Sequence, residues 1–551
     1  MCRNATILLI AALLICGRLS AVQYAYIVRF TDKNNTTFSL SAPGSYLSAR
    51  AITRRTAHGI AIDSTDLPIN SFYIDSVLTL TGGKIHGASR WFNFCVILLR
   101  DSANIHALDG KTFVSSTKYT AYYSDSLHKP ARENGMSAQQ KGTGDITYYN
   151  NTWQQTDLVH GDKLHDAGYT GNGKLIAVID EGFTDVNTHP GFSSMLSGGR
   201  LVDKYNFTLR TDFIYGYGWH GTRSLSTMAG YVPNTFVGAA PMASYALYVT
   251  EDGNSEQPIE LINMLFAAER ADSIGADIIT SSLGYNTFDN PADGFVFATD
   301  LDGKTTIAAK AANMATQKGI LFVASAGNEG GGAWNMVLTP GDADSALTIG
   351  SVDYTGVVAP NSGYGPNAAG RVKPDVCAMG QAAAVFIGSG YGTQSGTSFS
   401  TPQVAGWAAC LWQALPSAKP YELRDVIVRC ANSYATPGTH NGYGIPDFNC
   451  ARQLLLSIDD SLHPYTSATW VNAAPNPFVA SISLVVAADT EQRISFTLMD
   501  VAGRVVTSAA ADFNKGFNSP VTINVPDLPA GVYILKAVSA TREQVLKLVK
   551  N

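Results

Sequence analysis

The stretch that decides the fold is GTSFSTP at residues 396–402. It places a serine, Ser398, at the start of an almost wholly apolar segment that runs to Trp412. Pro402 suits the first turn of a helix, where its missing N–H group is not needed. A serine at the N-terminus of a buried helix lies among unpaired backbone N–H groups, which are able to hold an oxyanion. The same residue also suits a plain helix cap, so Ser398 by itself leaves both interpretations open.

Two apolar runs upstream of Ser398 end in polar residues. The run KLIAVIDEG at residues 174–182 contains Asp180, and GILFVASAGNEG at residues 319–330 contains Asn328. Short continuous apolar runs are typical of parallel strands buried on both faces, and open α/β sheets carry their sites at the carboxyl ends of such strands. Each polar residue taken alone would also suit a turn.

A histidine lies between these two runs, at the start of a segment of small residues. The sequence HGT at residues 220–222 opens a predicted helix that continues to Met228 and stops at Gly230. Three other histidines also precede a glycine, so the pair itself is uninformative: His58, His86 and His160. His220 differs from them because it lies between a strand-end aspartate and a candidate serine.

Taken together, Asp180, His220, Asn328 and Ser398 resemble the motifs of the subtilisin-like serine peptidases. The order Asp, His, Ser is that of this family, whereas the α/β-hydrolases run Ser, Asp or Glu, His and the chymotrypsin type runs His, Asp, Ser. The nucleophile-elbow pattern fails because Ser400 stands where a second glycine is required. The resemblance implies an α/β fold with a doubly wound parallel sheet.

The resemblance also implies a role for each of the four residues. Ser398 would attack the scissile carbonyl, while His220 would accept its proton and return it to the leaving amine. Asp180 would hold the imidazole tautomer and stabilise the imidazolium. Asn328 would donate to the developing oxyanion beside the Ser398 backbone N–H group. We therefore expect a serine endopeptidase that works through an acyl-enzyme intermediate.

Two further segments match the walls of the family's substrate cleft. The residues that the resemblance assigns to substrate binding are Ser282, Leu283 and Gly284 on one wall, Ala324, Ser325, Ala326 and Gly327 on the other, and Glu329 at the rim. In the family the first wall forms backbone hydrogen bonds with the substrate, and the pockets for the substrate side chains determine specificity. The apolar residues of 334–339 are expected either to floor a partly filled pocket or to pack beneath a loop.

Some positions depart from the family pattern. Glu181 follows the expected catalytic aspartate where Ser or Thr is usual, and Gly191 stands where many relatives have a calcium-binding aspartate. We therefore predict no metal site and no required cofactor, and structural calcium is left without support. The carboxylates of Asp252, Glu256 and Glu260 suit either a calcium site or a solvated face.

The N-terminal end has the pattern of an export signal. One arginine and a short apolar run precede Ala21, so residues 1–21 are predicted to be a signal peptide and not a membrane anchor. Lipidation at Cys16 is the alternative, and Ile15 disfavours it because a lipobox has a small residue there. No other segment is a transmembrane candidate.

Residues 22–141 resemble the small α/β propeptide of subtilisin-like zymogens. The expected elements are strands at 26–30 and 91–99 and helices at 45–58, which carries the basic pair Arg54-Arg55, and near 71–80. By resemblance this segment would template the folding of its own enzyme and then be cut off within the polar stretch 129–145. The alternative is a permanent N-terminal domain.

The remainder divides into a catalytic domain at 142–458, a polar linker at 459–469 and a β-sandwich at 470–551. Period-2 patterning predicts the sandwich strands at Ile482, Leu484 and Val486, at Ile494, Phe496 and Leu498, at Val521, Ile523 and Val525, and at Val532 and Ile534. The turn motifs PNP, DVAGR and LPAGVY resemble the C-terminal sorting domain of type IX secretion cargo in Bacteroidetes. That implies the type IX machinery as a partner and a secreted or cell-surface location; a substrate- or wall-binding module is the alternative.

The composition agrees with an exported enzyme. The 551 residues carry a net charge of −6 without a basic run, so the sequence lacks the basic patch that is typical of nucleic-acid-binding proteins. Charged residues make up 15%, below the usual ~25%. Four cysteines lie beyond the propeptide, namely Cys377, Cys410, Cys430 and Cys450, and their pairing is open, with Cys430–Cys450 favoured.

Two functions remain open at this point. The favoured one is a secreted serine endopeptidase, made as a self-processing zymogen, that acts on proteins or peptides. The alternative is a surface-displayed binding or adhesion protein on a peptidase scaffold with little turnover, for which Glu181 beside the site leaves room. A binding protein would be indifferent to Ser398→Ala.

Overall fold

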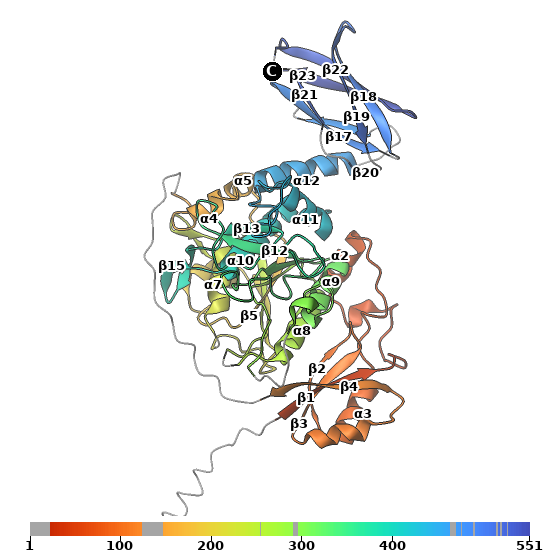
Figure 1. Cartoon of the computed structure of the whole chain (residues 1–551), viewed down its shortest axis with the longest axis vertical. Coiled ribbons are helices and arrows are strands. Elements are labelled where there is room, and N and C mark those ends of the chain that lie inside the picture. The colour runs from red at the N-terminus through yellow and green to blue at the C-terminus, as the bar shows by residue number, and fades with distance from the viewer. Residues whose placement is uncertain are drawn as a thin grey trace, which may run out of the picture. The chain divides into compact units, whose positions relative to one another are not determined.

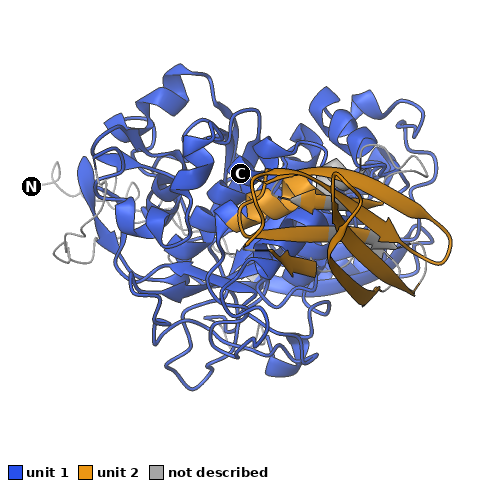
Figure 2. Ribbon diagram, turned by 90° about the horizontal axis from the view of Figure 1, so that it is seen from above, with its two compact units in different colours: residues 1–449 blue, residues 450–551 orange. Residues whose placement is uncertain are grey.

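The computed structural model describes residues 23–123, 147–216, 218–253, 255–289, 296–462, 470–474, 477–488, 491–513, 516–517, 521–525 and 527–550. The chain divides into two compact units, residues 1–449 and 450–551 (Figure 2). The expected signal peptide and processing junction lie outside the described residues, as does most of the expected linker.

The first unit contains a seven-stranded sheet in the order β13-β12-β11-β10-β5-β9-β6, with every neighbouring pair parallel. Strands β5 and β10–β13 are buried along their whole length, which explains their continuous apolar sequences. The predicted doubly wound α/β fold is thereby confirmed. The strands are β5 (Leu175–Asp180), β6 (Leu201–Asn206), β9 (Ser244–Val249), β10 (Ile278–Ser281), β11 (Leu321–Ser325), β12 (Leu347–Val352) and β13 (Val376–Met379).

The strand order reverses at β5. The chain passes from β5 to β6 and β9 on one side, then crosses to β10 on the other side and continues to β11, β12 and β13. In open α/β sheets the crevice at such a reversal, outside the carboxyl ends of the strands, is where ligands bind. Asp180 ends β5 and Ser281 ends β10, so both border this crevice.

Helices cover both faces of the sheet (Figure 1). On one face α8 and α9 pack against alternate residues of the strands, such as Ala177 and Ile179 of β5, while α10 crosses the strands from β5 to β13 on the other face. The helices are α4 (Trp153–Asp157), α5 (Asp162–Asp166), α6 (Ser193–Ser197), α7 (His220–Ala229), α8 (Pro258–Ile274), α9 (Ile307–Gln317), α10 (Thr397–Ala414), α11 (Pro420–Arg429) and α12 (Phe448–Leu462). Short hairpins join β7 (Tyr231–Val232) to β8 (Phe236–Val237) and β14 (Ala383–Ile387) to β15 (Gly390–Gln394).

The N-terminal part, residues 23–123, is an antiparallel sheet in the order β2-β3-β1-β4 with two helices. Its elements are β1 (Gln23–Phe30), α2 (Ala49–Ala57), α3 (Ser71–Thr81), β2 (Lys84–Ser89), β3 (Phe94–Leu99) and β4 (Val114–Tyr123). The strand expected at 91–99 begins only at Phe94, because residues 90–93 form the β2–β3 turn with Asn93 at φ 52°. The helix expected from residue 45 begins at Ala49, because the Ser48 side chain caps it.

The N-terminal part shares an apolar core with α8. Val96 and Leu98 of β3 belong to the same buried cluster as Phe266 and Ala267 of α8. Gly87 of β2 lies so close to α8 that a Cβ atom built on it would come within 2.4 Å of the Phe266 ring. Only a glycine permits this approach of the β2 backbone to the Phe266 ring.

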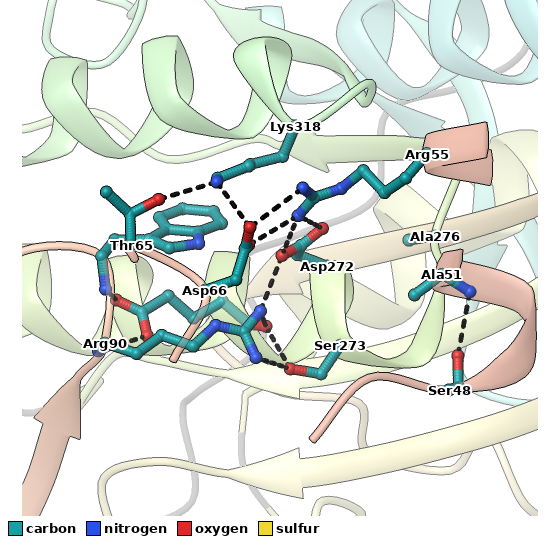
Figure 3. Close-up of polar contacts among 12 residues, drawn as sticks. Ser48, Ala51, Arg55, Thr65, Asp66, Arg90, Asp272, Ser273, Ala276 and Lys318 are labelled. Atoms are coloured by element: carbon teal, nitrogen blue, oxygen red, sulfur yellow. Dashed lines mark hydrogen bonds and ion pairs between the residues drawn. The ribbon is translucent and has the colours of Figure 1, made fainter. Parts of the chain in front are cut away.

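A buried cluster of charges joins the same two parts (Figure 3). We call it the Asp272 cluster: Asp272 of α8, which is fully buried, accepts hydrogen bonds from Arg54, Arg55 and Arg90. Arg55 and Lys318 both pair with Asp66 at 3.0 Å, which links α2 to the end of α9. The basic pair of α2 is therefore buried, with Arg54 5% and Arg55 1% exposed.

The second unit holds two antiparallel sheets, one of β16-β17-β20 with β21 on β17, the other of β19-β18-β22-β23, around one apolar core. The strands are β16 (Val471–Ala474), β17 (Ser481–Ala488), β18 (Gln492–Asp500), β19 (Val505–Phe513), β20 (Gly516–Phe517), β21 (Val521–Asn524), β22 (Gly531–Val538) and β23 (Glu543–Lys550). The expected alternation in β22 was wrong by one residue: Tyr533, Leu535 and Ala537 face the core, whereas Val532 is exposed. The run VYIL is apolar on both faces, so its sequence does not define which face is buried.

Among the described residues, no helix combines the length and the apolar character needed to cross a membrane. Cys430 and Cys450, the pair favoured from the sequence, are each disulfide-bonded. Cys95, Cys377 and Cys410 are buried and free, and burial raises the pKa of the Cys377 thiol to about 12, so it is inert as a nucleophile.

Candidate active site

Asp180 lies at the carboxyl end of β5, in the crevice where the strand order reverses. Its side chain is fully buried, and Oδ1 accepts hydrogen bonds from His220 Nδ1 at 2.6 Å and from the Glu181 backbone N–H at 2.8 Å. The second oxygen, Oδ2, is buried without a partner among the described residues. This arrangement directs the negative charge of Asp180 onto the imidazole.

His220 begins α7, which ends at Gly230 as the sequence predicted. Burial lowers the pKa of its imidazole, but the charge and hydrogen bond of Asp180, together with the charge of Glu181, outweigh burial and leave the pKa raised. Because Nδ1 is engaged by Asp180, Nε2 is the nitrogen available to exchange a proton with a reacting group. The ring also lies against Phe399, with 5.8 Å between ring centroids.

Ser398 is the second residue of α10 and is 5% exposed. Its hydroxyl donates to the Ser282 carbonyl at 3.2 Å and is not hydrogen-bonded to His220. Nucleophile and base are often further apart in a ligand-free site than in the substrate complex, and a rotation about χ1 redirects a serine hydroxyl.

Pro402 lies inside α10 and not in its first turn, contrary to the expectation from the sequence, because the helix already begins at Thr397. A proline there cannot donate to the carbonyl four residues earlier, which is that of Ser398. Hydroxyl groups replace the missing donor: Ser282 Oγ donates to the Ser398 carbonyl at 3.0 Å and Ser224 Oγ at 3.3 Å. The missing N–H group at Pro402 therefore ties the Ser398 backbone to α7 and to the residue that follows β10.

Asn328 follows β11, after Gly327 at φ 92°. Its Oδ1 accepts hydrogen bonds from the Thr397 backbone N–H at 2.9 Å and from the Thr397 hydroxyl at 3.2 Å. These bonds fix the amide plane and leave the Nδ2 group as a donor beside Ser398. That is the arrangement which an oxyanion hole requires.

The side chains of His220, Asn328 and Ser398 line one open cavity of about 540 Å³. Ser282, Leu283 and Gly284 also line it, whereas the residues predicted for the opposite wall, Ala324, Ser325, Ala326 and Gly327, and for the rim, Glu329, do not. Ala324 and Ala326 are fully buried, Ser325 donates to the Leu283 carbonyl at 3.0 Å, and Glu329 is exposed.

Leu338 fills the space between the two predicted walls. A Cβ atom built on Gly284 or on Gly327 would come within 2.8 Å or 2.6 Å of the Leu338 side chain. Leu338 is one of the apolar residues expected either to floor a pocket or to pack beneath a loop.

Six carboxylates also line the cavity. They are Glu181, Glu251, Asp252, Glu256, Glu260 and Asp289. One carboxylate oxygen from each of Glu251, Glu256 and Glu260 lies within 4.8 Å of the other two, and these oxygens are hard ligands of the kind that calcium takes. The sequence pattern groups Asp252 with Glu256 and Glu260 and does not indicate Glu251. Its position just beyond the carboxyl end of β9 is the signal that would have found it.

Comparison with known proteins identifies three segments of the chain. Residues 171–445 match the subtilase family model, residues 25–139 match the peptidase S8 propeptide domain of Bacteroidota, and residues 472–551 match a secretion system C-terminal sorting domain. The sorting domain indicates a secreted or cell-surface protein.

Several characterised proteases are similar to the central segment. Subtilisin NAT of Bacillus subtilis subsp. natto is 30% identical over 294 residues, which are 53% of this chain and 68% of that protein. Subtilisin Savinase of Lederbergia lenta is 29% identical over 289 residues, 52% of this chain and 92% of that protein. A solved protease from Pseudoalteromonas arctica is 22% identical and has a TM-score of 0.44, with 56% of this chain and 98% of that one covered. With an Asp-His pair, a serine at a helix N-terminus, the match to the subtilase family model and the match to Subtilisin NAT, the chain belongs to the subtilase family of serine peptidases.

Proposed function

We propose that this protein is an exported serine endopeptidase that cuts peptide bonds through Asp180, His220 and Ser398 and is made as a self-processing zymogen. The observation that carries the proposal is the 2.6 Å Asp180–His220 hydrogen bond in the cavity that also presents Ser398 and Asn328.

The residues act in a fixed sequence. Ser398 Oγ turns from the Ser282 carbonyl to His220 Nε2, gives up its proton and attacks the scissile carbonyl carbon. The imidazolium formed is stabilised by Asp180, and the oxyanion by Asn328 Nδ2 and the Ser398 backbone N–H group. His220 then protonates the leaving amine, and a water attacks the acyl-enzyme by the reverse route.

Labelling with a serine-reactive fluorophosphonate tests this proposal. We expect the secreted wild-type protein to be labelled on a shortened form, and the Ser398→Ala protein to carry no label. A wild-type protein that has lost residues 25–139 and still takes no label would contradict the proposal. The chain would then be a binding protein on a peptidase scaffold.

The pH dependence of kcat/KM reports the protonation of His220. Because the pKa of His220 is raised above 6.5 and only the neutral imidazole accepts a proton, activity should rise with pH until it passes that raised pKa. Glu181→Gln removes one of the charges that raise it, so the profile of this variant should move to lower pH. The pH–rate profiles of the wild type and of Glu181→Gln are measured on one peptide. If the profile of the variant does not move, or moves to higher pH, the charge of Glu181 does not raise the pKa of His220.

The role of Asn328 predicts a loss confined to the chemical step. Asn328→Ala should lower kcat by roughly 10²–10³, a magnitude that comes from subtilisin itself, with little change in KM. Asn361 supplies the control, because its amide only donates to Asn328 Oδ1 at 3.5 Å from an exposed position. Steady-state kinetics measure both constants. An equal fall in kcat for the two variants, or a change that appears as a higher KM, would argue against an oxyanion hole.

A further inference from the structure

The catalytic cavity is strongly acidic. Six carboxylates line it beside His220 and Ser398, and its lining among the described residues includes no lysine or arginine. Because the nucleophile opens into the same cavity, these carboxylates lie where a bound peptide must pass. They are therefore part of the substrate's surroundings and not a separate surface patch.

Glu251 is the most informative of the six. It is 7% exposed, and its Oε1 accepts hydrogen bonds from Thr250 Oγ1 at 2.6 Å and from the Tyr285 hydroxyl at 2.7 Å. No described residue donates to its other oxygen, although the residue lines the cavity. The other oxygen of Glu251 therefore has no protein donor on the cavity side and is available to a ligand.

Glu256 adds a second carboxylate, one oxygen of which lies within 4.8 Å of a carboxylate oxygen of Glu251. Neither residue forms an ion pair with any described residue. Burial raises the pKa of Glu251 to about 8 and that of Glu256 to about 7, as expected for carboxylates that lack a positive partner.

Both carboxylate oxygens of Glu260 accept backbone hydrogen bonds from the segment before α8. Its Oε1 accepts the Asp252 backbone N–H at 2.8 Å and its Oε2 accepts the Gln257 backbone N–H at 2.7 Å. Both oxygens are therefore engaged in holding the start of α8 and the loop that carries Glu256. Calcium takes six to eight oxygen ligands, whereas an ammonium group has three donors, so the remaining oxygens suit a cationic side chain better than a metal.

We propose that this acidic side of the cavity is a subsite for a lysine or arginine side chain of the substrate, with Glu251 and Glu256 as its specificity-determining residues. The inference rests on the proposed endopeptidase function. The substrates are then peptides with a basic residue near the scissile bond, on the side that runs along Ser282–Gly284.

The test uses processed wild-type enzyme and pairs of fluorogenic peptides that differ only by lysine against norleucine, at each position before the scissile bond in turn. At one position kcat/KM should be about tenfold or more higher for lysine, because an opposite charge in a desolvated site contributes strongly. Glu256→Gln and Glu251→Gln should each bring this ratio down toward 1. Asp157→Asn, which removes an exposed charge on α4 outside the cavity, should leave the ratio unchanged.

The other possible results each contradict a different part of the proposal. A ratio near 1 at every position, or a ratio that survives both glutamine variants, would refute the basic subsite while leaving the peptidase intact. Stoichiometric calcium binding that is lost in Glu256→Gln would make the cluster a metal site instead. If no peptide is cut and no fluorophosphonate label appears, the proposed function itself fails.

Discussion

Ser398→Ala should abolish peptide hydrolysis and leave the N-terminal part attached. Removing a triad serine costs about 10⁶ in kcat, a magnitude taken from subtilisin, because the remaining groups have no nucleophile to activate. The loss of processing follows if the chain cuts itself, since the variant lacks the proposed nucleophile of the cavity that His220 and Asn328 line. The measurements are kcat/KM on a peptide and the size of the secreted protein.

Ser400 offers a matched control in the same helix. It is fully buried two residues further on, and its hydroxyl donates to the Thr397 carbonyl at 3.1 Å within α10. Ser400→Ala should therefore be processed and active within a few-fold of wild type. A Ser398→Ala protein that is shortened like the wild type would show that another protease removes residues 25–139.

Asp272→Ala should loosen the N-terminal part from the rest of the first unit. The change leaves the buried arginines of the Asp272 cluster (Figure 3) without their shared carboxylate, and removing one partner of a buried ion pair costs about 3–5 kcal/mol. Measured in a Ser398→Ala background, which keeps the chain whole, cleavage of residues 23–123 by an added protease should accelerate roughly 10²- to 10⁴-fold, because cleavage follows the open population.

The control for this prediction is an exposed carboxylate that also joins the N-terminal part to the rest of the first unit. Asp63 pairs with Lys318 at 3.3 Å, but its side chain is 56% exposed, so Asp63→Ala should change the free energy of docking by about 1 kcal/mol or less. Equal protease resistance of wild type and Asp272→Ala would mean that the apolar core around Phe266 holds the two parts together without help from the charges.

The residues of the proposed catalytic site were predictable because they lie in motifs at or near the ends of elements, and because these motifs resemble those of the subtilisin-like peptidases. Asp180 follows a fully apolar strand and His220 begins a helix of small residues. The sheet topology then brings these ends together, since the carboxyl ends of parallel strands share one edge.

Other local predictions failed where a pattern was compatible with two conformations. Trp91 and Phe92 look like strand residues but lie in a turn, because Asn93 takes a left-handed conformation. Pro402 looked like a first-turn residue, but hydroxyl groups from two other elements compensate for its missing N–H group inside α10. Neither outcome can be derived from neighbouring residues alone.

The sequence by itself determined the parallel α/β sheet through its short apolar runs, because such runs are a local property, and its resemblance to known families supplied the four residues of the proposed catalytic site and the N- and C-terminal accessory segments. Tertiary structure alone decided that the basic pair of α2 is buried on Asp272, that Leu338 fills the space between Gly284 and Gly327, and that Glu251 joins Glu256 beside the nucleophile. These features bring together residues that are distant in the chain or belong to different elements. The charge and size of each side chain are visible in the sequence. Which residues neutralise the charges, and which spaces are filled or left open, is decided by the packing.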